Sequence, residues 1–419
     1  MSRAGWAARV AAALAVFLVS WSVIHHGFLA RSQIEDTGLY QQYGDAMAGG
    51  EVPYRDFHLE YPPGALPVFV LPSLGHEGDR NAYDSWFDRL MALCGCLAVA
   101  GVGLALRALD AGRRRTTAAL GLVAISPVLA GSVLLSRFDL WPAALAVLAL
   151  AAMLHRRLAL AAVGLAAAIA AKIWPLVLAP LFLAHVWRTR GRRAAVTWAV
   201  ELVVVEAAIF VPFAVVSPGG VWASLRTQMV RPLQLESLGS AVLIAIHDVA
   251  GTPLHLVSSY GSQNVAGPGV HEVEIATSVL GVLSLVVVWL LFARRPSDGE
   301  RLVLYAGAAV AAVLAFGKVF SPQYVIWLVP LVALARGRRG LATGALVASA
   351  LVLTQLWFPQ HYWPLALRFA QPEAWFLLAR DLVVVTAAIV LAWPSSEHEP
   401  LGERRALIEA LQRVRTQVD

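Results

Sequence analysis

The residues best suited to chemistry lie in one long acidic segment near the start of the chain. Ten carboxylates fall between Glu35 and Asp88, mixed with tyrosines and prolines as in Glu60-Tyr61-Pro62-Pro63. Connecting segments longer than about 12–15 residues are usually functional or disordered, and aromatic residues at this density argue against disorder. One carboxylate in this segment is suited to act as a general base on a hydroxyl group.

Several charges occur where they would be costly in lipid. Lys172 and Lys318 each begin a short proline-containing segment after an apolar stretch, and Arg137 and Asp139 follow another. Ionisable residues near the membrane interior generally face a bundle interior or a watery cavity. Together with Arg231, the two lysines would suit a phosphate at membrane depth. The structural alternative is snorkelling, or mutual pairing such as Asp139 with Lys172.

Membrane helices must position these residues. The chain is 58% hydrophobic and 14% charged, whereas about a quarter of residues are charged in soluble domains. We therefore predict an all-α polytopic membrane protein with about twelve transmembrane helices. The predicted spans lie near residues 6–26, 89–108, 117–135, 139–154, 158–171, 175–187, 194–216, 275–293, 302–317, 323–335, 340–357 and 375–393.

The spans define a single transmembrane domain over residues 1–393. Its first outer loop, 27–88, is expected to carry short helices, and a second outer loop covers 217–274. Within the first loop, the apolar piece 65–74 is too short to cross a bilayer, so we predict a re-entrant or interfacial element. The remaining residues, 394–419, show helical spacing of apolar side chains and are predicted to form a cytoplasmic amphipathic tail.

Two junctions between short apolar segments contain proline. The first, Lys172-Ile173-Trp174-Pro175, joins segments 158–171 and 175–187, and a similar arrangement occurs at 318–324. We predict that each pair of short helices meets at the proline below the outer surface. Non-helical backbone at that depth is tolerated only where it lines protein or a cavity.

The formal charge of +6 is explained by membrane topology. Short arginine clusters end every second apolar span, and most of the 33 Lys and Arg then fall in inner loops, while most of the 27 Asp and Glu fall outside. By the positive-inside rule, both termini are predicted to be cytoplasmic and the acidic loops to face the outer, periplasmic side of the cell membrane. A nucleic-acid partner is not needed.

No cofactor is predicted, since the sequence has no dinucleotide, phosphate-loop or Ser-His-Asp signature. Its histidines do not have the spacing of metal ligands, so we also predict that no metal is required. The opposing possibility is that Asp36, Asp139 and the loop carboxylates hold a divalent cation.

Five sequence pieces resemble glycosyltransferase family 87, a group of polytopic GT-C enzymes typified by phosphatidylinositol mannoside mannosyltransferases. The first is the run from Asp36 to Gly64, which includes Gly50-Glu51-Val52-Pro53-Tyr54-Arg55-Asp56-Phe57 and Glu60-Tyr61-Pro62-Pro63. The other four follow in order: Arg137-Phe138-Asp139, Lys172-Ile173-Trp174-Pro175, Arg231-Pro232-Leu233-Gln234-Leu235-Glu236-Ser237, and Lys318 to Tyr324.

The resemblance implies transfer of a sugar, usually mannose, from a polyprenyl-phosphate-sugar donor to a lipid-linked glycan acceptor. Asp36 matches the family's acidic base position, and the adjacent Glu35 is the alternative. Lys172, Lys318 and Arg231 would hold the donor phosphate. The donor sugar is β-linked in this family, so inversion would give an α-linked product. The implied substrate-binding residues are Glu35, Tyr54, Asp56, Glu60, Tyr61, Arg137, Asp139, Glu236, Gln323 and Tyr324.

The residues are also compatible with two alternative functions. An arabinofuranosyl donor carries the same lipid phosphate and would be held equally well by the cations. A transporter or flippase of lipid-linked sugars would also use many helices with proline-broken junctions, although transporters tend to have two matching halves. Whichever function holds, membrane lipids are predicted partners because they surround the helices.

Overall fold

The computed structural model describes residues 2–30 and 34–393, and helices make up most of this part of the chain. The predicted tail, 394–419, lies outside the described residues. The helices are α1 (Arg3–Val23), α2 (Thr37–Ala48), α3 (Leu66–Ser73), α4 (Arg80–Ala108), α5 (Arg113–Ala130), α6 (Leu140–Leu154), α7 (Leu158–Ala171), α8 (Ala179–Arg190), α9 (Arg192–Val216), α10 (Pro218–Val230), α11 (Leu238–Ala250), α12 (Val270–Ala293), α13 (Gly299–Phe316), α14 (Leu328–Ala333), α15 (Gly337–Gln355), α16 (Tyr362–Arg368) and α17 (Glu373–Ala392).

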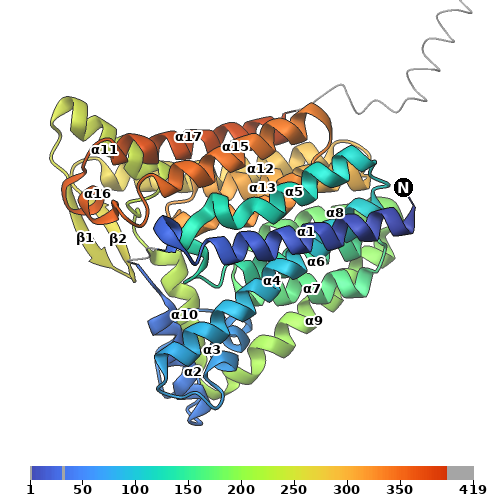
Figure 1. Cartoon of the computed structure of the whole chain (residues 1–419), viewed down its shortest axis with the longest axis horizontal. Helices are drawn as coiled ribbons and strands as arrows, with labels where there is room; N and C mark the ends of the chain where they lie inside the picture. Colours follow the sequence, from blue (N-terminus) through green and yellow to red (C-terminus); the bar gives the residue numbers. More distant parts are fainter. Residues whose placement is uncertain (1, 31–33, 394–419) are drawn as a thin grey trace, which may run out of the picture.

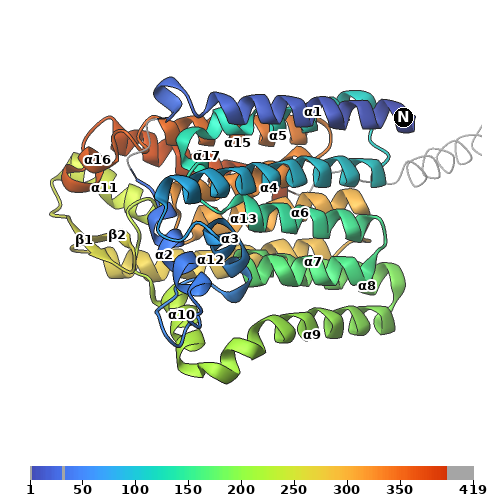
Figure 2. The same cartoon turned by 60° about the horizontal axis from the view of Figure 1, so that its bottom comes forward.

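The long helices lie side by side in a bundle (Figures 1 and 2). Each of the twelve predicted spans overlaps a helix, although 323–335 is a 3₁₀ turn followed by the six-residue α14. The number of spans that cross the membrane remains a prediction. Of the described helices, seven are long and apolar enough to cross a membrane: α1, α4, α5 with its continuation to Leu134, α9, α12, α13 and α17. The prediction of an all-α polytopic membrane protein is therefore confirmed.

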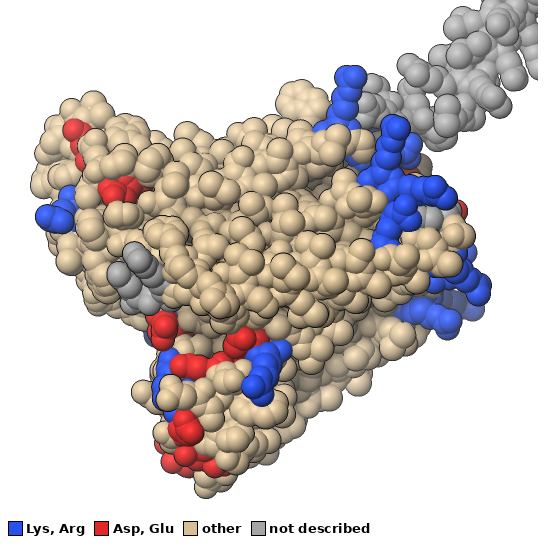
Figure 3. Space-filling view, viewed as in Figure 1, with Lys and Arg blue, Asp and Glu red and all other residues tan. Residues whose placement is uncertain are grey.

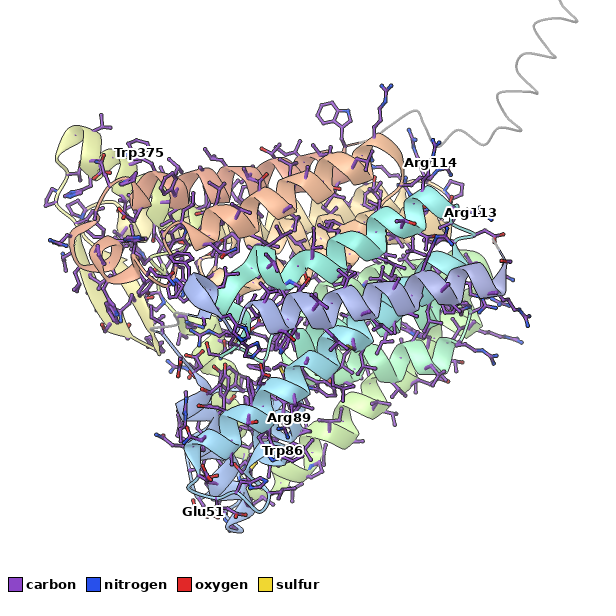
Figure 4. All side chains as sticks on the ribbon, viewed as in Figure 1. Glu51, Trp86, Arg89, Arg113, Arg114 and Trp375 are labelled. Atoms are coloured by element: carbon purple, nitrogen blue, oxygen red, sulfur yellow. The ribbon has the colours of Figure 1, made fainter. Side chains whose placement is uncertain are left out.

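Charge is divided between the two ends of the bundle. In Figure 3, Lys and Arg gather at the end that holds the N-terminus, while Asp and Glu lie at the opposite end. Figure 4 labels Arg113 and Arg114, which begin α5 at the basic end, and Glu51, which follows α2 at the acidic end. The positive-inside rule predicts that the basic end faces the cytoplasm.

The two proline-containing junctions interrupt helices inside the bundle. After α7, Lys172 is extended, and a 3₁₀ turn (Trp174–Leu178) leads into α8. After α13, a second 3₁₀ turn (Pro322–Trp327) leads into α14. Each turn has a proline in its first two positions, where the missing N–H and the bias of the preceding residue away from helix stop an α-helix from running through.

A short β-hairpin in the second outer loop was not predicted. Strands β1 (His255–Ser259) and β2 (Ser262–Ala266) pair antiparallel, with Ser259 opposite Ser262. The backbone N–H of Leu235 donates to the carbonyl of Gln263 (2.9 Å), so the hairpin is fixed to the segment before α11. Its strands lack a clear alternation of apolar and polar residues, which is why the sequence indicated only a loop.

The first outer loop packs directly on the end of α7. The carbonyl of Gly64 accepts a hydrogen bond from the indole of Trp141 (3.0 Å). A Cβ atom at Gly64 would lie 2.5 Å from the backbone of Ala170 and Ala171, beside Lys172. This close approach requires glycine, and it places the Glu60–Pro63 segment next to the junction after α7.

We expect Gly64→Ala to lower the free energy of unfolding by about 1–3 kcal/mol, because overpacking against backbone cannot be relieved by rotating a side chain. The matched control is Gly121→Ala in α5, where an added Cβ meets nothing within 4 Å and alanine is the better helix former. Thermal unfolding of the two variants in detergent measures the difference. Equal midpoints would contradict the tight packing at Gly64.

Candidate active site

A cavity of about 430 Å³ lies at the acidic end of the bundle. Its volume falls within the range of small-molecule sites, about 300–1,000 Å³. Parts of the chain far apart in sequence form its wall: the start of α2, both proline-containing junctions, the segment before α11, the hairpin tip and α16. Its charged lining residues are Asp36, Glu60, Arg137, Lys172, Arg231 and Glu236.

Asp36 is held by an ion pair at the entry to α2. Its Oδ2 lies 2.8 Å from Nη1 of Arg137, and the hydroxyl of Tyr40 donates to the same oxygen (3.3 Å). The Asp36 side chain is 33% exposed, whereas the Arg137 side chain is 6% exposed. The buried guanidinium therefore fixes the carboxylate while leaving it accessible from the cavity.

Lys172 sits among aromatic rings and a buried carboxylate. Its Nζ lies 2.7 Å from Oδ1 of Asp139, and the indole of Trp327 donates to the same oxygen (2.6 Å). The rings of Phe138, Tyr324 and Trp327 lie 4.7 to 5.2 Å from the ammonium, which is the range of cation–π attraction. The Asp139–Lys172 pair considered as a structural alternative is thus present, yet Lys172 also lines the cavity.

Three consecutive residues connect these two ion pairs. Arg137 reaches Asp36 and Asp139 reaches Lys172. Between them, the ring of Phe138 packs edge-on against Tyr61, with centroids 5.1 Å apart. The segment 137–139 therefore positions a carboxylate on one side and an ammonium on the other.

Arg231 differs from the other cations of the cavity because it forms no hydrogen bond or ion pair with the described residues. Its Nε is buried without a partner. Burial raises the pKa of the Glu60 carboxyl, and the charge of Arg231 opposes that rise. Burial likewise raises the pKa of Glu236 to about 7. An arginine left unsatisfied beside these acids is available to an anionic ligand.

Lys318 does not line the cavity. Its Nζ pairs with Oε1 of Glu274 on α12 (3.2 Å), and its carbonyl accepts from the backbone N–H of Gln234 (2.9 Å). The main chain of Lys318 therefore supports the cavity wall, while its ammonium is committed elsewhere. Of the three cations predicted to bind the donor phosphate, Lys172 and Arg231 line the cavity and Lys318 does not.

Glu35 also lies outside the cavity lining. Its carboxylate pairs with Arg80 on α4 (3.2 Å), and its side chain is half exposed. Arg80 is held in turn by Asp84 (2.7 Å). Of the two adjacent acids, Asp36 lines the cavity and Glu35 does not.

Tyr54 and Asp56 stabilise the outer loop and do not line the cavity. The Tyr54 hydroxyl donates to the carbonyl of Tyr61 (2.7 Å), and the Tyr54 carbonyl accepts from the Ser217 hydroxyl (2.9 Å). The carboxylate of Asp56 accepts from its neighbour Arg55 and from a backbone N–H, and these hydrogen bonds lower its pKa to about 2. Asp139, by contrast, is buried behind Lys172, and it is also absent from the cavity lining.

The remaining predicted substrate-binding residues line the cavity with the charged groups: Glu60, Tyr61, Arg137, Glu236, Gln323 and Tyr324. The sequence did not indicate lining residues from several elements: α10, α13, the hairpin tip (260–263) and the segment around α16. The hairpin tip supplies Tyr260, and the segment around α16 supplies Phe358, Tyr362 and Trp363. The density of aromatic residues after α15 was the only sequence signal for the segment around α16.

Within residues 2–30 and 34–393, no group of three or more His, Cys, Asp or Glu is placed to hold a metal ion. The metal-independence of the site remains a prediction.

The described residues form a bundle of membrane helices with a polar cavity at one end, and this cavity is lined by both carboxylates and cations. The family model described as glycosyltransferase family 87 matches residues 57–322. This match covers more than half of the chain, which therefore belongs to glycosyltransferase family 87 and is a membrane glycosyltransferase rather than a transporter or flippase. No curated protein matches the chain.

The matched region includes most of the charged residues of the cavity but not Asp36. It contains Glu60, the 137–139 segment, Lys172 and Arg231, but it begins after Asp36. The role of Asp36 therefore rests on its geometry and on the resemblance of the outer loop.

We expect Lys172→Met to reduce glycosyltransferase activity by about 10²–10³-fold, the usual loss when one electrostatic donor is removed from an active site. Because it leaves Asp139 buried and unpaired, the substitution should also destabilise the fold by about 3–5 kcal/mol. Steady-state rates and thermal unfolding measure the two effects.

Two controls separate chemistry from folding. The double variant Lys172→Met, Asp139→Asn removes both charges, so it should recover stability without recovering activity. Lys318→Met removes an ammonium whose partner is partly exposed, and it should retain most activity. If Lys318→Met proved as damaging as Lys172→Met, the assignment of the cavity cations would be wrong.

Proposed function

We propose that this glycosyltransferase transfers mannose from polyprenyl-phosphate-mannose to a lipid-anchored glycan at the outer face of the membrane, with inversion to an α linkage. The observation that carries the proposal is the arrangement of the cavity. Segment 137–139 holds an accessible carboxylate, Asp36, through Arg137 and a cavity-lining ammonium, Lys172, through Asp139.

The cations suit a lipid phosphate. A phosphate diester carries one negative charge, which Lys172 can meet as a point charge and Arg231 as a planar fork. The cavity is also lined by apolar residues from α10, α13 and the helix junctions, which suit the first units of a polyprenyl chain: Ile173, Met229, Val313, Leu314 and Val319. A soluble nucleotide-sugar has no lipid chain that could contact these apolar residues.

The reaction needs one base and a stabilised leaving group. Asp36 accepts the proton of the acceptor hydroxyl as its oxygen attacks the anomeric carbon of the donor sugar. A new C–O bond forms on one face while the bond to the phosphate oxygen breaks on the other, and the bonding electrons remain on the phosphate. Lys172 and Arg231 stabilise that negative charge, so no general acid is required.

An arabinofuranosyl donor would place the same phosphate on the same cations. The resemblance to mannoside mannosyltransferases favours mannose. Parallel assays with polyprenyl-phosphate-mannose and polyprenyl-phosphate-arabinose distinguish the two sugars by which donor releases polyprenyl phosphate in the presence of acceptor.

Asp36→Asn should reduce turnover by about 10²–10⁴-fold, the usual contribution of a general base. The amide keeps the shape of the carboxylate, so donor binding should survive and a direct binding assay should show it. Glu35→Gln is the matched control, since Glu35 pairs with Arg80 outside the cavity. Near-normal turnover of Asp36→Asn combined with an inactive Glu35→Gln would assign the base to Glu35.

Exhaustive EDTA treatment should leave the transfer rate unchanged. Protein cations can match the single charge of the phosphate diester, so a divalent ion has no charge left to neutralise. The measurement compares initial rates before chelation, after chelation and after addition of Mg²⁺ or Mn²⁺. Loss of activity that either ion restores would show that a metal neutralises the phosphate.

A further inference from the structure

Two exposed aromatic side chains stand at the cavity on elements that the reaction scheme does not use. Tyr260 at the hairpin tip is 45% exposed and Trp363 on α16 is 43% exposed, and both line the cavity. Large aromatic side chains left in contact with solvent beside a cavity are candidates for ligand contacts.

Tyr260 adopts a conformation that a bulky residue seldom takes. Its φ is +52°, and φ of the following Gly261 is +65°, as in the type I′ turn of a two-residue hairpin. Asn-Gly or Asp-Gly usually occupies such a turn, and positive φ is a genuine outlier for bulky side chains. Outliers of this kind persist where the surrounding structure enforces them, often at ligand sites.

The surrounding structure does fix this tip. The Asn264 side chain donates to the carbonyl of Ser259 (3.1 Å), and the backbone N–H of Val265 donates to the carbonyl of Leu233 (3.1 Å). A Cβ atom added at Gly261 would lie 3.5 Å from a carboxylate oxygen of Glu60. The hairpin therefore holds its tip beside an acidic residue of the cavity.

The second aromatic approaches from a neighbouring element. Helix α16 packs against β1, and both lie at the same end of the bundle (Figures 1 and 2). The Trp363 ring meets the ring of Tyr362 edge-on at 5.4 Å, which helps to fix its orientation. Tyr260 and Trp363 thus form an aromatic rim on two packed elements.

We propose that this aromatic rim binds a pyranose ring of the acceptor glycan, an inference that rests on the proposed function. A pyranose has a face of C–H groups, which packs on the negative face of an aromatic ring, and an edge of hydroxyls. Glu60 and Gln263 line the cavity beside the rim and can bind those hydroxyls. The rim therefore selects a carbohydrate acceptor over a lipid headgroup without a sugar.

A membrane-anchoring role for the rim is the competing explanation, since Trp and Tyr are enriched at membrane interfaces. Trp375 on α17 provides the comparison. It is 40% exposed at the same end of the molecule (Figure 4) but is not among the residues that line the cavity. The rim aromatics differ from it because they face the same space as Asp36.

The test uses the full-length protein in lipid nanodiscs and octyl α-mannopyranoside as the probe. Saturation-transfer NMR should detect contact between protein and the ring protons of the sugar. Tyr260→Ala and Trp363→Ala should each weaken binding by about tenfold, a loss of about 1.4 kcal/mol, whereas Trp375→Ala should bind like the parent protein. Octanol, which has no sugar ring, should show no such dependence on the rim.

Turnover with polyprenyl-phosphate-mannose provides the second readout. The rim variants should raise the acceptor KM by about tenfold and leave the donor KM unchanged. Absence of ring-proton saturation in the parent protein, or equal saturation in all variants, would overturn the proposal. So would a change in membrane insertion without a change in sugar binding, which would identify an anchor. Sugar binding without any release of polyprenyl phosphate would count against the proposed function and leave the rim assignment standing.

Discussion

The ion pair between Asp36 and Arg137 is the interaction on which the site depends. These residues lie far apart in sequence, and their pairing, 2.8 Å between Oδ2 and Nη1, joins the first outer loop to the helical bundle. Because Arg137 is buried, its charge needs a partner, and loss of that partner would leave an uncompensated charge. The need to satisfy one buried guanidinium thus fixes the position of a carboxylate that lines the cavity.

The second constraint is the break in two helices. A continuous α-helix through residue 172 would satisfy its own backbone hydrogen bonds. The Lys172 ammonium would then point outward from the helix axis and would not lie at a junction between two helices. The 3₁₀ turn that begins at Trp174 instead aligns that indole with Trp327 of the second junction, and their rings stack 5.0 Å apart. Two interrupted helices therefore support each other and enclose a polar site within apolar surroundings.

The sequence was most informative where the physical signal was local. Apolar segments of suitable length located the helices, and prolines located both junctions, because these effects operate within a few residues. The ion-pair partners could not be predicted from the sequence. Lys172 and Lys318 occur in similar sequence contexts, but the 137–139 segment brings Asp139 to Lys172, whereas α12 brings Glu274 to Lys318. The hairpin was not predicted for two reasons. Its strands lack a clear alternation of apolar and polar residues, and its turn, Tyr260-Gly261, is an unusual type I′ sequence in a hairpin that is hydrogen-bonded to the segment before α11.

The choice of donor distinguishes an enzyme that takes its sugar from a lipid phosphate from one that takes it from a nucleotide. Purified protein would be incubated with a lipid-anchored glycan and either polyprenyl-phosphate-mannose or GDP-mannose, with product and leaving group measured together. We expect equal amounts of α-mannosylated glycan and polyprenyl phosphate from the lipid donor, and no transfer from the nucleotide donor. Transfer from GDP-mannose with none from polyprenyl-phosphate-mannose would contradict this expectation.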